Sequence, residues 1–272
     1  MPTRNLTRRI TQALTRKATE PGSGGGWSPL SLFASGEQGV WYDPSDFSTM
    51  FQDSAGTTPV TAVGQPVGKI LDKSGRGNHA SQSTAAARPV LQQDGNGKYY
   101  LAFDGVDDFL STGSINFTAT DKMTVVAGVR KLSDAATASF VELSAALPSN
   151  NGSFAIFLPP AAGNFNAVFS VRGTSNASAN YNIGAAPVSV VFTGQADIAT
   201  DFARVSINGI NGTPTATDQG TGNFGNYPIY IGRRAGTSLP FNGRLYQLIV
   251  RGATTADLVR VETFVNSKTG AY

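Results

Sequence analysis

The sequence contains no cysteine, one histidine and four glutamates, and only 14% of its residues are charged. Without cysteine the chain can form neither disulfides nor thiolate metal sites, so its stability must come from a packed core. No segment approaches the ~18 consecutive apolar residues of a membrane span. No apolar segment follows the basic N-terminus, as it does in a signal peptide. We therefore expect no membrane span and no export by a signal peptide.

The few charges are unevenly distributed. The net charge is +3, and five basic residues precede the first acidic residue, Glu20: they are Arg4, Arg8, Arg9, Arg16 and Lys17. The remainder of the chain is slightly acidic, so we do not expect the protein as a whole to bind nucleic acid.

Glycine is abundant, with 31 residues among 272, and Ser, Thr, Ala and Asn are frequent too. This composition is typical of an all-β protein with many turns. Apolar and polar residues alternate over 123–130 and 188–193, as in half-buried strands. Residues 203–207 lead into Asn208 and Gly209, a strong hairpin signal. Together these patterns predict one large antiparallel β-sandwich.

The most informative stretch is residues 98–110, KYYLAFDGVDDFL. Tyr99, Leu101 and Phe103 fall on one side of an extended chain, which predicts a strand with a buried face. Asp104 and Gly105 then favour a tight turn before a second apolar segment. We expect two strands joined by an acidic corner.

Residues 103–110 resemble the F-D-G-x-x-D-aromatic-apolar signature of laminin-G-like domains, in the concanavalin A-like lectin/glucanase superfamily. Residues 229–232 (IYIG) and 241–250 (FNGRLYQLIV) are similar to the late strands of that family. The resemblance covers roughly residues 38–270. It implies an antiparallel β-sandwich jelly roll with a helix closing its C-terminal end. Lectins, hydrolases and adhesive modules all use this fold, so the resemblance does not decide the function.

The N-terminal residues predict a separate element. Leu6, Ile10 and Leu14 recur every four residues beside Arg9, which indicates a basic amphipathic helix within residues 1–20. So short a helix needs a partner surface, and these four residues are the expected anchor. The alternatives are a disordered basic tail, or contact with nucleic acid or membrane. Residues 21–37 are predicted to be a Gly/Ser-rich linker and residues 38–272 the sandwich.

A C-terminal helix is also expected. The strand at 245–250 is apolar on both faces, so its outer face must be covered. Thr254 is a candidate N-cap, with Asp257 three residues later, and Gly270 a candidate end. The apolar face of this helix would consist of Leu258, Val261, Phe264 and Val265.

Catalytic groups are scarce. Retaining glucanases need two carboxylates about 5–5.5 Å apart, and none of the four glutamates, Glu20, Glu37, Glu142 and Glu262, is paired on a strand. His79 lies in a glycine-rich loop at 72–80, DKSGRGNHA, where we expect it to be a hydrogen-bonded loop residue. The loop is similar to one that precedes the F-D-G corner in the resembling family. We predict that the protein is not an enzyme.

Asp104, Asp107 and Asp108 are the candidate metal ligands, because Ca²⁺ takes carboxylate oxygens. Alternatively, Asp104 stabilises the turn while Asp107 or Asp108 bonds to backbone amides or pairs with Arg88 or Arg244. We predict no cofactor, with Ca²⁺ as the alternative.

The candidate sugar-binding residues lie in Gly/Asn-rich stretches, where exposed rings can stack on sugars. They are Tyr181, Phe224 and Tyr227, with Arg233 and Arg234 nearby. Loops on a rigid scaffold often carry binding sites. The alternative is that these rings form the rim of the core.

Residues 41–46 (WYDPSD), followed by the loop at 72–80, resemble proteins of tailed bacteriophages and prophages. This resemblance implies a virion protein. We therefore predict a non-catalytic, homo-oligomeric virion protein, anchored to other virion subunits by its N-terminal segment. Its lectin-like sandwich would decorate the particle or bind a host-surface glycan. The alternatives are a purely structural capsid or tail protein with no sugar binding and, less favoured, a glycoside hydrolase.

Overall fold

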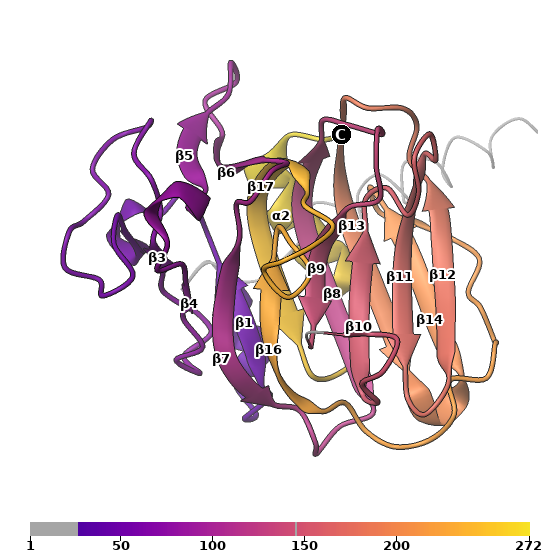
Figure 1. Ribbon diagram of the computed structural model, residues 1–272. Coiled ribbons are helices and arrows are strands. Elements are labelled where there is room, and N and C mark those ends of the chain that lie inside the picture. The colour runs from indigo at the N-terminus through magenta and orange to yellow at the C-terminus, as the bar shows by residue number, and fades with distance from the viewer. Residues whose placement is uncertain (1–26, 145) are drawn as a thin grey trace, which may run out of the picture.

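Two antiparallel sheets pack face to face in the computed structural model, which describes residues 27–144 and 146–272 (Figure 1). The predicted all-β sandwich is therefore confirmed. The predicted N-terminal helix, with Leu6, Arg9, Ile10 and Leu14, lies outside the described residues.

The eight-stranded sheet is built around two long central strands. Its members are β1 (Gly39–Tyr42), β5 (Val90–Gln93), β6 (Tyr99–Asp104), β8 (Lys122–Lys131), β13 (Val188–Asp197), β14 (Phe202–Ile207), β15 (Ile210–Asn211) and β17 (Asn242–Arg251). Their order is β15-β14-β13-β8-β17-β6-β5, and β1 pairs with β17. Asn208 and Gly209 have φ of 53° and 76° and join β14 to β15, which confirms the predicted hairpin.

The nine-stranded sheet forms the opposite layer. Its members are β2 (Met50–Phe51), β3 (Lys69–Ile70), β4 (Ala80–Ser81), β7 (Leu110–Asn116), β9 (Ser139–Leu143), β10 (Ser153–Phe157), β11 (Asn166–Arg172), β12 (Asn176–Asn182) and β16 (Asn226–Ile231). Their order is β12-β11-β10-β9-β16-β7-β4-β3-β2, so β12 is an edge strand. Within residues 27–144 and 146–272 there are four short 3₁₀ helices: η1 (Pro29–Phe33), which precedes β1, and η2 (Phe47–Thr49), η3 (Ala85–Ala87) and η4 (Ile198–Thr200), which lie between strands.

The core lies between the sheets and is rich in phenylalanine. The ring of Phe169 lies 5.6 Å from that of Phe154 on the same sheet and 6.4 Å from that of Phe192 on the other. Phe103, from the predicted strand at 98–104, is buried in this core, as the alternation indicated.

The helix α2 (Leu258–Thr269) covers part of the outer face of the eight-stranded sheet (Figure 1). Val261 and Val265 pack there against Val126, Val191 and Ile249, and Gly270 ends the helix in the left-handed conformation, both as predicted. Thr254 is not the N-cap. Asp257 directly precedes the helix, and its carboxylate accepts the amide of Arg260 at 3.1 Å. Nowhere in the described chain is a helix both long and apolar enough to cross a membrane.

Residues 27–37 belong to the folded body and not to a linker, which corrects the predicted boundary at residue 38. Phe33 is buried beside Trp41, and the ring of Trp27 packs on Phe264 of α2 at 5.7 Å. Glu37 forms an ion pair with Arg251 at 2.7 Å. Apolar residues at 27–33 form these contacts. The glycine-rich stretch directly before them led to the prediction that they belong to a linker.

Candidate functional site

The acidic corner connects β6 to β7. Asp104 accepts the amides of Val106 and Asp107 at 2.7 and 3.3 Å, and Asp108 accepts the amide of Asp104 at 3.0 Å. One oxygen from each carboxylate lies within 4.8 Å of the others. Burial raises the pKa of Asp108 to about 6; the amide of Asp104 opposes this shift, and the charges of Asp104 and Asp107 add to it. These contacts favour the turn-stabilising role.

Of the two roles expected for Asp107 or Asp108, the bond to a backbone amide is present at Asp108, and the ion pairs with Arg88 or Arg244 are not formed. Arg88 donates to the carbonyls of Gln82 and Ser83, and Arg244 stacks on the ring of Tyr100. No basic side chain of residues 27–144 or 146–272 forms an ion pair with the three aspartates. Their oxygens suit Ca²⁺ in kind, but some already accept amides, and Ca²⁺ takes six to eight oxygens. A cation here would need water ligands, and calcium stays the untested alternative to the turn-stabilising role.

The predicted aromatic cluster does not assemble. Phe224 is fully buried, 6.4 Å from Phe154, so the expectation that it is exposed is wrong. Its amide bonds to the carbonyl of Thr120 at 2.8 Å, which holds the loop across the end of the core. Tyr227 is half-buried and donates to the carbonyl of Asn151 at 3.1 Å.

Arg233 and Arg234 lie beyond the other end of β16, about 20 Å along the strand from Tyr227 at 3.3 Å per residue. Arg234 forms an ion pair at 2.8 Å with the fully buried Glu142 and stacks on Phe157. Arg233 donates to the carbonyl of Thr237 at 3.1 Å. The Arg234 pair neutralises a buried carboxylate, which is a structural role.

The described glutamates lie in separate elements and have separate partners. Glu37 pairs with Arg251, Glu142 with Arg234, and Glu262 on α2 accepts the hydroxyl of Thr193 at 2.6 Å. They form none of the pairs that hydrolysis by the glucanase mechanism needs.

The loop at 72–80 is held together by Asp72. Its carboxylate accepts the amides of Trp41, Ser74 and Asn78 at 2.8 to 3.0 Å. His79 accepts the amide of Asp72 at 3.0 Å through Nδ1. The prediction of a hydrogen-bonded loop histidine is confirmed, and the loop fastens β1 to the body.

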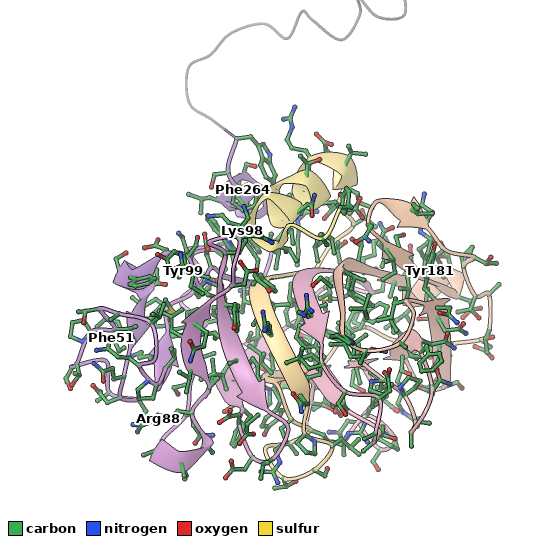
Figure 2. The ribbon with its side chains drawn as sticks, turned by 90° about the horizontal axis from the view of Figure 1, so that it is seen from above. Phe51, Arg88, Lys98, Tyr99, Tyr181 and Phe264 are labelled. Carbon is green, nitrogen blue, oxygen red and sulfur yellow. The ribbon has the colours of Figure 1, made fainter. Side chains whose placement is uncertain are left out.

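A groove runs along the free edge of β12, where the chain after β15 passes close to it. Its volume is about 620 Å³, and its lining consists of Asn166, Ser178, Ala179, Asn180, Tyr181, Asn182, Asn211, Gly212, Thr213, Pro214 and Thr215. Figure 2 shows Tyr181 at this side of the sandwich, opposite Phe51. Of the predicted sugar-binding residues, Tyr181 alone lines the groove.

The groove is polar but carries no charged side chain. Its asparagines and threonines offer both donors and acceptors, and Tyr181 offers a partly buried ring. Gly212 lets the chain after β15 lie close to Tyr181, because a Cβ atom at position 212 would lie only 2.9 Å from the Tyr181 ring. Such a surface can bind an uncharged, hydroxyl-rich ligand.

The sequence interpretation missed the asparagines and threonines of this groove. Residues 176–182, NASANYN, alternate polar and small residues, the pattern of a strand with a polar outer face. That signal could have located Asn180 and Asn182. Nothing local indicates that residues 211–215 lie opposite them.

The two packed antiparallel sheets define a jelly-roll β-sandwich. No family model and no curated protein matches the sequence. Among solved structures, the receptor binding domain of botulinum neurotoxin D superposes with a TM-score of 0.55 and 10% identity, over 73% of this chain and 50% of that one. The botulinum neurotoxin DC binding domain in complex with SialylT gives 0.53 and 12%, over 73% and 48%.

A third neighbour is the serotype D ligand binding domain in complex with N-acetylneuraminic acid, with a TM-score of 0.53 and 12% identity, over 72% of this chain and 48% of that one. This chain therefore spans about half the length of these neighbours. At such identities the comparison shows a common fold. The neighbours are binding domains.

Proposed function

We propose that the protein is a non-catalytic adhesion module of a tailed-bacteriophage particle and that its groove binds a host-surface glycan. The groove of amide and hydroxyl groups beside Tyr181 is the observation that carries the proposal. The lectin-like fold of the botulinum binding domains also supports it. The virion assignment rests on the resemblance of residues 41–46 and 72–80 to phage proteins.

The chemistry of the groove matches a saccharide. Sugar hydroxyls both donate and accept hydrogen bonds, as do the side chains of Asn180 and Thr213. The apolar face of a pyranose can stack on the ring of Tyr181. No cofactor enters this proposal.

Attachment to the particle would make weak binding effective. The N-terminal segment, through Leu6, Arg9, Ile10 and Leu14, would dock onto other virion subunits. An array of copies can raise avidity by about 10²- to 10⁴-fold without any new contact. Single sites with millimolar affinity would then hold a particle on a cell.

The test is a glycan screen with the full chain, followed by titration of each hit into the variants Asn180→Ala and Tyr181→Ala. Both substitutions should weaken binding at least tenfold. Asn180→Ala should leave the Tm within a few degrees, whereas Tyr181→Ala also removes a ring that packs on the core and should lower the Tm. Asn176→Ala is the matched control, because Asn176 lies on the outer face of the same strand, outside the groove lining. The proposal fails if no glycan binds, or if the control weakens binding as much.

A further inference from the structure

Strand β12 is an open edge of the nine-stranded sheet (Figure 1). It pairs with β11 in an unbroken antiparallel register from Asn176 to Asn182, and no described strand lies on its other side. The amide of Ile183 bonds to the carbonyl of Phe165 at 2.9 Å, which identifies the hydrogen-bonded positions of this pair. Such positions alternate along an antiparallel ladder. The amides and carbonyls of residues 176, 178, 180 and 182 therefore point away from β11, along the free edge.

The other edges of the described sheets are short or covered. The strand β15 has only two residues, and Pro214, which has no amide hydrogen, follows it closely. Backbone amides of connecting segments bond to the edges of β5, β2 and β1: Gly64 to Leu91 at 2.7 Å, Val60 to Met50 at 2.9 Å and Lys73 to Trp41 at 2.9 Å. Within the described chain, β12 is thus the long edge that stays open.

The strand β12 also lacks the features that protect edge strands from pairing. These features are charged side chains, proline and β-bulges. Its sequence is NASANYN, and its register with β11 shows no shift. A regular, uncharged edge of this kind can add another strand through backbone hydrogen bonds.

There is room for a further strand beside β12. The chain at 212–215 belongs to the other layer, because Gly212 and Thr215 donate their amides to Val205 and Ala203 of β14 at 3.0 and 2.8 Å. The groove, of about 620 Å³, lies between this segment and β12. The outward backbone groups of β12 are therefore accessible from the groove.

We propose that β12 pairs with β12 of a second copy of this chain, antiparallel about a twofold axis. An axis at Ala179 places Ser178 of one copy opposite Asn180 of the other, and this register pairs all four outward positions. On the inner face, the small side chain of Ala177 lies opposite Tyr181 of the other copy, which leaves room for the ring. No like charges meet across the axis, because the strand carries none.

This pairing goes beyond the glycan-binding function and does not rest on it. Both use β12, so a paired copy and a bound glycan exclude one another at this edge. The pairing is therefore measured without glycan, and its failure leaves the glycan proposal intact.

Charge swapping across the axis tests the pairing on the full chain. Two double variants are compared: Ser178→Lys with Asn180→Lys, and Ser178→Glu with Asn180→Glu. Each variant alone places like charges about 5 Å apart across the axis, so its mass in sedimentation should be half the native mass. An equimolar mixture places opposite charges across the axis and should recover the native mass.

The control is Ser114→Lys, which adds charge at an exposed position of β7, inside the same sheet. It should keep the native mass. Thermal melting of every variant establishes folding. If a double variant does not fold, Asn180→Pro takes its place, because it removes one outward amide, leaves the ladder with β11 intact and should also halve the mass.

Four results would each overturn the proposal. They are a native chain that stays monomeric at its highest soluble concentration, a folded edge variant that keeps the native mass, a mixture that does not recover it, and an equal loss in the control.

Discussion

Glu262 is a buried carboxylate held by a single hydroxyl, from Thr193. Burial raises its pKa above 4.5, and the hydrogen bond from Thr193 and the charge of Arg204 only partly oppose this. The native state therefore holds this proton more tightly than the unfolded chain does. The contribution of Glu262 to stability falls as pH rises from about 4.5 through the raised pKa, and stays low above it.

We accordingly predict that Glu262→Gln, which is neutral at every pH and keeps an acceptor for Thr193, gains stability over the native chain as pH rises from 4 to 7. Thermal melting across that range measures the difference. Glu37→Gln is the opposite case: burial raises the pKa of Glu37, but hydrogen bonds, including those from Arg251 and the Ser35 amide, lower it overall. That variant should lose stability relative to the native chain as pH rises through the lowered pKa to about 4.5, with little further change above it. If the stability difference between Glu262→Gln and the native chain stayed constant from pH 4 to 7, the raised pKa of Glu262 would be contradicted.

A second prediction at this scale concerns Asp104. Asp104→Ala should lower the free energy of unfolding by about 0.5–1.5 kcal/mol, because two exposed turn amides exchange their carboxylate acceptor for water. Urea unfolding measures this loss. Adding Ca²⁺ or a chelator to the native chain should leave its Tm unchanged. A rise in Tm that saturates with Ca²⁺ and disappears in Asp107→Asn would instead establish a calcium site.

Among the larger elements, α2 depends on one glycine beneath it. A Cβ atom on Gly128 would lie 1.9 Å from Oγ1 of Thr269, so the helix end rests directly on β8. Gly128→Ala should force the helix outward and destabilise the protein by about 1–3 kcal/mol. Gly113→Ala is the matched control, because Gly113 also lies in a strand but has open space around it. Equal Tm values for the two variants would rule out this contact.

Elements with a clear local signal were predictable from the sequence. Alternation indicated β8 and β13, the Asn208 and Gly209 pair indicated the β14–β15 hairpin, and an apolar face with a terminal glycine indicated α2. The partners of side chains were not predictable. Arg234 and Glu142 are 92 residues apart in the chain, and only the pairing of β16 with β9 brings them together.

Candidate sites were harder to predict than strands, for a physical reason. Composition shows that Phe224 lies in a loop, but cannot show that this loop closes the end of the core. The groove needs β12 and residues 211–215, which come from different sheets and meet only in the folded chain. Tyr181, which lines the groove, could be singled out because an aromatic ring among asparagines is itself a local signal, and its role in sugar binding stays a prediction.

At the scale of the whole molecule, the proposed anchoring can be separated from the sandwich. Ile10→Glu with Leu14→Glu should abolish co-sedimentation of the full chain with particles that lack this protein, because charge would replace the apolar stripe. Thr11→Glu with Thr15→Glu adds the same charge off the stripe and should leave co-sedimentation intact. All variants should melt alike. If the stripe variant still sediments, the sandwich itself holds the particle.

The packing of Trp27 against Phe264 determines which side of the sandwich faces a support when the body is attached at residue 27. The chain enters the body on the side that α2 covers. A sensor chip coupled at residue 27 would therefore lie against that side, while the groove at the edge of β12 lies elsewhere on the sandwich. Coupling through the outer face of the nine-stranded sheet would instead bring the support close to the exposed side chains of β12, so comparing the two immobilised forms would show whether the groove is the binding surface.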